Sequence, residues 1–543
     1  MDRKNYTVAV DLGSSSVVVA VGETRDDGRM HVAAVVRKPV EGVNAGRIDN
    51  IELVSRAIRE AVSEVEAQLG IRITEAYAGI SGDFVRCARH TDHVYVFDPE
   101  TGVSQKDVDA LFDRMRNVQA PDDETIMERI PQNYMVDDNQ EVKNPVGSFG
   151  KKLSSTFNFI LCHKTPVQRL DMALKRLSIK MLGVFADALS TPEAVLLPEE
   201  KEEGVAVVDL GAGVTDVTVY YRNVVRYTVS IPMGASAINR DIRTMGVPEK
   251  HVESLKKRFG SAVAELASED KLIRVNGRTA RDAKDILLRN LATVIEARAT
   301  DIAEFVQQEI KDSGYASKLA YGIVLTGGSA QLKDLDELFR RVTQMDVRVA
   351  VPDVGIAEES REIAASPDYA TVVGLLLKGA AQGACAVVEY ASPAPAASAA
   401  PAAQPAAAPA APTRPASAQP RPAAAEPRRG FVPPATQPAA QPAAAPAPRP
   451  VQPRTAQPRP VQPRQPQAPA PAQPQPRMAV PQPAPQLEPQ RLEPRQPLAA
   501  PEPVEEERPV VIDSRRKRDW SSIFQKAFDK VNQSFTAAED EEI

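Results

Sequence analysis

Three glycine-rich turns bring together the residues of this chain whose types and spacing suit phosphate and metal chemistry. They read Asp11-Leu12-Gly13-Ser14-Ser15, Asp209-Leu210-Gly211-Ala212-Gly213 and Thr326-Gly327-Gly328-Ser329. Small residues let a backbone approach a phosphate with its N–H groups directed at the oxygens. A carboxylate at a strand end can hold the water shell of a bound Mg²⁺. We therefore expect Asp11 and Asp209 to hold Mg²⁺ through water, and the small residues of the first two turns to hold phosphates. The third turn could then seat the rest of a nucleotide.

Each turn must be positioned by the element before it. The residues that precede the turns are short β-branched runs, 8–10, 207–208 and 323–325. Such runs predict buried strands that feed tight turns. The first two turns share Asp-Leu-Gly about 200 residues apart, which indicates a duplicated domain. A single turn of this kind is typical of an ordinary β-turn, but three in this order favour a nucleotide held from both sides of a cleft.

Composition divides the 543 residues sharply. Residues 1–390 are mixed enough to form real cores, whereas 391–512 is Pro, Ala, Gln and Arg and holds most of the 47 prolines. This stretch cannot bury enough apolar area to offset chain entropy, so it predicts a disordered linker. A flexible coil of this length spans on the order of 60 Å.

Bulk charge and cysteine usage exclude several classes of protein. The net charge of −6 gives no support to nucleic acid as a partner. Cys87, Cys162 and Cys385 show no CxxC spacing, which fits a reducing cytosol and argues against a zinc site or a disulfide framework. Neither a signal segment nor a membrane-spanning run is apparent. We expect a cytoplasmic protein.

The last thirty residues form a different kind of segment. Large apolar residues recur there at spacings of three and four, which predicts an α-helix with one apolar stripe. The predicted segment is 513–543, and its last residues form an acidic tail. A basic cluster lies beside the only Trp. This combination suits the surface of an anionic membrane, and docking on protein is the alternative. The expected membrane-binding residues are Arg515, Arg516, Lys517, Arg518, Trp520, Ile523, Phe524, Ala527, Phe528, Val531 and Phe535.

The three turns resemble the nucleotide site of the actin, Hsp70 and sugar-kinase superfamily, and within it the FtsA family of bacterial division proteins. The resemblance covers about residues 5–380. It implies ATP and Mg²⁺ as ligands. The segments that it matches are the first phosphate loop (Asp11–Ser16), the second phosphate loop with Thr215 (Asp209–Asp216), an adenosine contact at Glu253 and Lys256, an adenosine turn (Thr326–Leu332) and a last connecting helix near 367–374.

Two stretches resemble the FtsA family in particular. Ile130–Asp137 and Asn144–Leu153 look like the signature of a subdomain inserted in that family, and Pro232-Met233-Gly234 also fits. The implied fold is α/β and actin-like, with two lobes that each hold a mixed sheet flanked by helices. The expected parts are lobe 1 (1–83, 166–196 and 363–390), the insert (84–165), lobe 2 (197–362, with a helical upper subdomain at about 241–319), the linker (391–512) and the terminal helix (513–543).

The sequence departs from the family at a few positions. Val214-Thr215 stands where Thr-Thr is common, which removes one hydroxyl from the second phosphate loop. Ala235 replaces a usual glycine, so we expect a less permissive turn there. The segment 187–193 has no Gln or His to orient a water. Asp187 and Glu193 could take this role, but a helix cap and a surface charge are the favoured interpretation. ATP binding is therefore expected to be firmer than ATP hydrolysis, and no catalytic residue is assigned.

The resemblance implies a peripheral protein at the division site, on the cytoplasmic face of the inner membrane. It would assemble with itself into filaments, bind the C-terminal peptide of the tubulin-like protein FtsZ and meet other division proteins through the insert. Arg298 is one candidate contact for that peptide, and a helix-surface ion pair is its alternative. Two other functions stay open: a small-molecule kinase or phosphatase of the same superfamily, and another actin-like scaffold such as one for pilus assembly.

Overall fold

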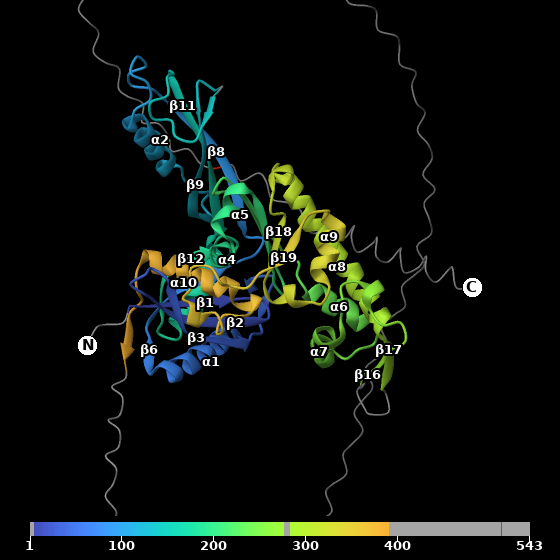
Figure 1. Ribbon diagram of the computed structural model, residues 1–543. Helices are drawn as coiled ribbons and strands as arrows, with labels where there is room; N and C mark the ends of the chain where they lie inside the picture. Colours follow the sequence, from blue (N-terminus) through green and yellow to red (C-terminus); the bar gives the residue numbers. More distant parts are fainter. Residues whose placement is uncertain (1–4, 139, 276–282, 390–511, 513–543) are drawn as a thin grey trace, which may run out of the picture. The chain divides into compact units, whose positions relative to one another are not determined.

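The computed structural model describes residues 5–138, 140–275, 283–389 and 512, which belong to one compact unit (Figure 1). The expected terminal helix and all of the expected linker except residue 512 lie outside the described residues. Among the described helices, none combines the length and the apolar character that crossing a bilayer requires.

The first sheet carries the first glycine turn. Its five strands are β12 (Lys180–Ala186), β7 (Glu75–Ile80), β1 (Tyr6–Leu12), β2 (Ser16–Thr24) and β3 (Met30–Pro39), in that order. β1 pairs in parallel with β7 and antiparallel with β2, so the sheet is mixed, as expected. Almost every side chain of β1 is buried, which explains why its centre, Val8-Ala9-Val10, is continuously apolar instead of alternating.

Helices cover this sheet and complete its core. α1 (Ile51–Leu69) packs on β2 and β3, and α10 (Ala370–Gln382) packs on β1 (Figure 1). α1 begins at Asn50, whose side chain accepts hydrogen bonds from two backbone N–H groups, and ends at Gly70 in a left-handed conformation. α3 (Lys164–Lys175) and α4 (Asp187–Val195) flank β12, and β6 (Ile71–Ile73) pairs with β20 (Val387–Glu389). The predicted last connecting helix is confirmed as α10.

The second sheet carries the other two turns. Its nine strands are β10 (Gln140–Val142), β9 (Glu124–Val136), β11 (Lys152–His163), β8 (Val85–Tyr95), β15 (Val224–Ile231), β14 (Thr215–Tyr221), β13 (Val205–Leu210), β18 (Ile323–Thr326) and β19 (Val347–Val349). β13 and β18 are parallel neighbours, so the second and third turns leave the same edge of the sheet. The strands of the expected insert join those of the expected second lobe at one registered pair, Val229 opposite Arg86.

Helices beside the second sheet form a further core. α8 (Leu288–Asp312) packs on α6 (Ser236–Thr244) and α9 (Leu335–Thr343), and α7 (Glu249–Phe259) packs on α6. The stretch 241–319 is not wholly helical, because β16 (Leu272–Val275) and β17 (Lys284–Leu287) pair within it. Along β16, buried Ile273 and Val275 alternate with exposed neighbours, the two-residue period of a strand.

Two further helices and one pair of short strands lie outside these groups. α2 (Gln105–Asn117) packs on β8 and β11. At its start, Oδ2 of Asp107 accepts hydrogen bonds from the backbone N–H of Ser104 at 2.8 Å and from the Ser104 hydroxyl at 2.6 Å. α5 (Pro198–Glu203) follows α4, and β4 (Val43–Asn44) pairs with β5 (Arg47–Ile48).

Candidate nucleotide-binding site

The first two turns are closed in the same way. The N–H of Gly13 donates to the carbonyl of Ser16 at 3.0 Å, and the N–H of Gly211 donates to the carbonyl of Val214 at 3.0 Å. Each turn joins a buried strand to its antiparallel partner, β1 to β2 and β13 to β14. The shared geometry supports the expected duplication, because equivalent residues of the two turns occupy equivalent places.

Close approach between the turns requires glycine at two positions. A Cβ on Gly213 would lie 2.5 Å from Oγ of Ser14, so the two phosphate loops meet there. Gly327 has a φ of +85°, and a Cβ there would lie 2.2 Å from Oδ1 of Asp209. The three turns therefore converge, and any side chain at 213 or 327 would force them apart.

Hydroxyl groups hold the two carboxylates of the second turn. Oδ2 of Asp209 accepts hydrogen bonds from Thr191 of α4 and Thr371 of α10, each at 2.8 Å. Asp216 accepts from Ser81 at 2.6 Å and from Ser230. Two elements that follow the first sheet thus orient a carboxylate of the second sheet, which ties the site to both halves of the fold.

Burial controls the protonation of these acids. Burial, followed by the charge of Asp209, raises the pKa of Asp11 to about 7. Burial and the same neighbour raise the pKa of Asp216 to about 7. The pKa of Asp209 itself is raised by burial and moderated by its two threonine donors. Several acids that share little solvent favour their neutral forms, and a cation among them would reverse this preference.

Asp187 corrects one expectation. It is 5% exposed and lies at the first turn of α4, where it makes no side-chain cap, so it is not a surface charge. Its Oδ1 has no hydrogen-bond partner among the described residues, and burial together with Asp11 raises its pKa. Gly79 leaves room for this carboxyl group. The expectation holds for Glu193, which pairs with Lys201 at 2.8 Å.

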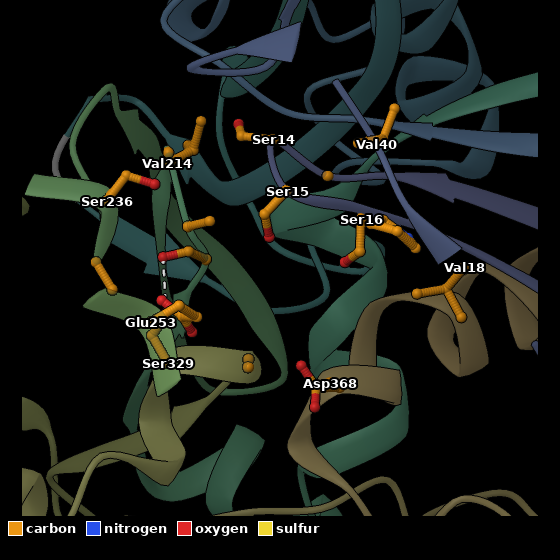
Figure 2. Close-up of a pocket in the computed structure, with 18 of the residues that line it drawn as sticks. Ser14, Ser15, Ser16, Val18, Val40, Val214, Ser236, Glu253, Ser329 and Asp368 are labelled. Atoms are coloured by element: carbon orange, nitrogen blue, oxygen red, sulfur yellow. Dashed lines mark hydrogen bonds between the residues drawn. The ribbon is translucent and has the colours of Figure 1, made fainter. Parts of the chain in front are cut away.

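These groups line a cavity of about 1210 Å³, large enough for a nucleoside triphosphate. Figure 2 shows Ser14 and Ser15 on one side of it and Val214, Ser236 and Glu253 on the other. The cavity gathers twelve of the thirteen expected ligand-binding residues, namely Asp11, Gly13, Ser14, Ser15, Asp209, Gly211, Gly213, Glu253, Lys256, Gly327, Gly328 and Ser329. Their contact with a ligand stays a prediction.

Glu253 and Lys256 come from the same face of α7. Nζ of Lys256 lies 2.9 Å from a carboxylate oxygen of Glu253, and the lysine is buried. Burial lowers the pKa of Lys256, whereas the lysine, acting against burial, holds the pKa of Glu253 below its usual value. Asn239 of α6 donates to Glu253 at 2.7 Å. The pair presents donor and acceptor atoms at the wall formed by the helices.

Thr215 does not line the cavity. Its Oγ1 donates to the carbonyl of Met233 at 2.7 Å. The neighbouring Val214 does line the cavity, so the hydroxyl that this chain lacks relative to Thr-Thr is the one that would face a ligand. Ala235 also differs from expectation. Its φ of −65° is open to any residue, so the turn does not need a second glycine.

Sequence reasoning missed several residues of the cavity wall. Arg37 of β3 donates to Ser16 at 3.0 Å and lies 3.0 Å from Asp368, bringing a cation close to the first turn. Its position near the end of a strand carries no local motif. Asp216 and Thr371 lie inside segments already singled out, but only the fold shows that their side chains face Asp209 and its surroundings.

The acids fit a cation that is held through water. No set of three or more His, Cys, Asp or Glu side chains in the described part of the chain is placed to bind a metal directly. Asp11, Asp187, Asp209 and Asp216 nevertheless line one cavity, with one carboxylate oxygen unsatisfied. This arrangement suits Mg²⁺, which keeps several waters and takes few direct protein ligands.

Arg298 does not serve as a surface contact. It is 6% exposed, and its guanidinium lies 2.6 Å from Asp241 of α6 and 3.1 Å from Asp301 of α8. The alternative interpretation, a helix-surface ion pair, agrees better with the structure, although the pair that Arg298 forms is buried between helices. A peptide could reach Arg298 only by breaking these contacts. The expected membrane-binding residues from Arg515 to Phe535 lie outside the described residues.

Two family models match the chain. "Cell division protein FtsA" matches residues 206–374, and "SHS2 domain inserted in FTSA" matches residues 82–161. The cell division protein FtsA of Pseudomonas aeruginosa is 30% identical over 373 residues, covering 68% of this chain and 88% of its own length. That of Escherichia coli strain K12 is 30% identical over 388 residues, covering 70% and 91%. The chain belongs to the FtsA family.

Membership makes this an actin-like cell-division protein with the SHS2 subdomain of the FtsA family inserted between β7 and α3. Among solved structures it is similar to the PilM-PilN type IV pilus biogenesis complex (14% identity, TM-score 0.49, 69% of this chain and 98% of that one). It is also similar to MreB5 of Spiroplasma citri bound to ADP (13%, 0.41, 68% and 94%).

Proposed function

We propose that this FtsA-family protein binds Mg²⁺-ATP in the cavity between its glycine turns. It then assembles with further copies and attaches FtsZ to the inner membrane. The observation that carries nucleotide binding is the convergence of three glycine turns on a cavity lined by Asp11 and the buried Asp187, Asp209 and Asp216. Backbone N–H groups of the turns would face the phosphates, and the acids would hold the hydrated cation opposite them.

The proposed role of each residue in binding Mg²⁺-ATP depends on where it lies in the cavity. Asp11 and Asp209 would orient waters of the Mg²⁺ shell, and the threonine hydroxyls on Asp209 would keep that carboxylate aimed. Mg²⁺ itself would neutralise phosphate charge. Arg37 would add a positive charge near the first turn, while Glu253 and Lys256 would meet the nucleoside. These roles rest on the cavity lining and on the hydrogen bonds that fix the carboxylates.

Hydrolysis is proposed to be slow. Asp187 is the one buried carboxyl in the cavity whose Oδ1 lacks a partner among the described residues, so it is the group available to accept a water proton. Burial, followed by the charge of Asp11, raises the pKa of Asp187, which favours the neutral carboxyl group over the carboxylate that would accept this proton. Val214 offers no hydroxyl at the second loop. Both features favour holding ATP over cleaving it.

Membrane attachment is assigned to residues 513–543, and FtsZ binding to the helices α6 to α8. The first proposal rests on the apolar stripe and basic cluster of the sequence. The second rests on family membership. In this arrangement the FtsZ peptide binds the helical subdomain, which is joined to the part of the protein that contains the SHS2 subdomain. Residues 513–543 then bind this assembly to the membrane.

The proposal is tested by flotation with anionic liposomes and a labelled FtsZ C-terminal peptide. With Mg²⁺-ATP, the full chain should float and carry the peptide with it. Phe524→Glu should abolish flotation, because it places a charge on the apolar stripe. Gln525→Glu adds the same charge to the polar side and should still float. Peptide that stays behind while the protein floats would contradict the FtsZ role, and equal flotation of both variants would contradict the membrane role.

A further inference from the structure

One residue from the end of the expected linker is buried in the SHS2 subdomain. Ile512 is 4% exposed, although the next described residue towards the N-terminus is Glu389. The N–H of Ile512 donates to the carbonyl of Gln119 at 3.1 Å. A backbone hydrogen bond combined with side-chain burial fixes both the position and the register of a chain segment.

The surface that receives Ile512 has a structural origin. Phe157, Phe159 and Leu161 alternate along β11 and therefore share one face of the sheet. α2 covers part of this face but ends at Asn117. Met115 and Val118 at the helix end, with the three β11 side chains, form one apolar cluster that includes Ile512. The isoleucine therefore packs on this face at the end of α2.

We propose that the segment at Ile512 is an internal docking strand, which holds the C-terminal end of the chain on the SHS2 subdomain of the same molecule. The sequence around it fits this occupant. Val510, Val511 and Ile512 form an apolar run that follows the Pro-rich stretch and stops at Asp513. The edge at Gln119 offers a backbone carbonyl, and the cluster offers an apolar socket for the third residue of the run.

Docking changes the point from which the terminal helix reaches the membrane. The last described attachment before residues 513–543 is then Ile512, so the length of chain after Glu389 does not set their reach. Residues 513–543 then start from the SHS2 subdomain. For membrane attachment this consequence rests on the proposed function, whereas the docking itself does not.

Cysteine crosslinking of the full chain tests the contact. Ala120 packs against the same apolar cluster as Ile512, so the two side chains share one face, whereas the side chain of Gln119 is exposed. Adjacent hydrogen-bonded segments bring Cα atoms within about 5.5 Å, which a disulfide can span. We expect Ala120→Cys with Ile512→Cys to oxidise to an intramolecular bond that changes gel mobility without reductant. The matched control is Gln105→Cys with Ile512→Cys, since Gln105 belongs to the same subdomain but lies at the other end of α2. Each single variant controls for the native cysteines.

The outcomes separate the possibilities. At least tenfold more intramolecular product for the Ala120 pair than for the Gln105 pair supports docking. Equal yields, or no product, overturn it. A product of twice the chain mass overturns docking within one molecule and assigns the socket to a second copy. None of these readouts requires membrane or nucleotide, so a failure of docking is distinguishable from a failure of the proposed function.

Hydrogen exchange provides a second measurement in a chain without engineered cysteines. The Ile512 amide should exchange at least tenfold more slowly than amides near residue 490. Ile512→Ser should remove most of this protection while leaving exchange in β1 and β13 unchanged. An Ile512 amide that exchanges as fast as the middle of the Pro-rich stretch contradicts the proposal.

Discussion

At the scale of single residues, Asp209 is the centre of the site. It accepts two threonine hydroxyls, lies against Gly327 and raises the pKa of both Asp11 and Asp216. Asparagine keeps one acceptor oxygen for the threonines but removes the charge. We expect Asp209→Asn to fold and to weaken Mg²⁺-ATP binding by at least tenfold, measured by calorimetric titration. Asp171→Asn, which removes a carboxylate on α3, should bind as the unmodified chain does.

The second residue-scale prediction compares two neighbours. Val214→Thr puts a hydroxyl into the cavity, and a hydrogen bond to a charged group contributes about 1.5–3 kcal/mol. ATP affinity should therefore rise about tenfold in an equilibrium titration. Thr215→Val removes a buried hydroxyl that donates to Met233. It should lower the free energy of unfolding by about 1–2 kcal/mol with little effect on ATP affinity. The reverse pattern would show that position 215 faces the ligand.

The third residue-scale prediction concerns pH. Asp11 and Asp216 have pKa values of about 7 in the fold, against about 4 when unfolded. The unfolded chain therefore releases these protons first, so the stability without nucleotide is highest below about pH 4 on their account and falls as pH rises towards 7. The thermal midpoint of the metal-free chain should drop by several degrees between pH 5 and 7.5. Asp216→Asn should flatten this decline, and an unchanged slope would contradict the burial of these charges.

Residue-level patterns predicted the turns but not their full lining. Glycines 213 and 327 were recognisable because strand-then-glycine is a local pattern, and the structure puts both at points of close approach. Other residues come to the site from separate parts of the chain, namely Arg37, Ser81 and Thr191. No local sequence pattern predicts that their side chains lie there. The interpretation of Asp187 as a cap or surface charge missed its burial, because the carboxyl group lies against Gly79 of β7, which is far away in the sequence.

At the scale of elements, α8 is held to α6 by a buried ionic contact. Removing Arg298 leaves Asp241 and Asp301 without their shared cation, and breaking such a pair costs about 3–5 kcal/mol. We expect Arg298→Met to lower the free energy of unfolding by roughly that amount in urea titration. Arg289→Met, on the same helix, breaks only an exposed pair with Glu269 and should cost less than about 1 kcal/mol. Equal losses of unfolding free energy would mean that the buried ion pair stabilises the fold no more than the exposed one.

The sequence predicted which segments are helices or strands better than it predicted which strands pair. Continuous apolar runs predicted β1 and β13, and the apolar stretch after Pro367 predicted α10. The β16–β17 pair was missed because strands of four residues within a largely helical region carry little periodic signal. The union of SHS2 strands and β15 in one sheet depends on a single registered pair, which no sequence pattern encodes.

At the scale of the whole molecule, assembly and membrane attachment should depend on each other. One amphipathic helix binds a membrane only moderately, but helices carried by neighbouring copies act together, since each bound helix raises the effective concentration of the next. If Mg²⁺-ATP favours self-association, liposome binding should rise more steeply than linearly with protein concentration in its presence. Asp209→Asn should bind with a shallower dependence, although its terminal helix is unaltered.

Flotation over a hundredfold range of protein concentration measures this dependence. The informative comparison is between the full chain and Asp209→Asn, each with and without Mg²⁺-ATP. A steep curve that only the full chain shows, and only with nucleotide, links the buried carboxylate to the membrane through assembly. Identical curves for both proteins would separate the two activities. The terminal helix would then act alone, and the cavity would serve a purpose other than controlling attachment.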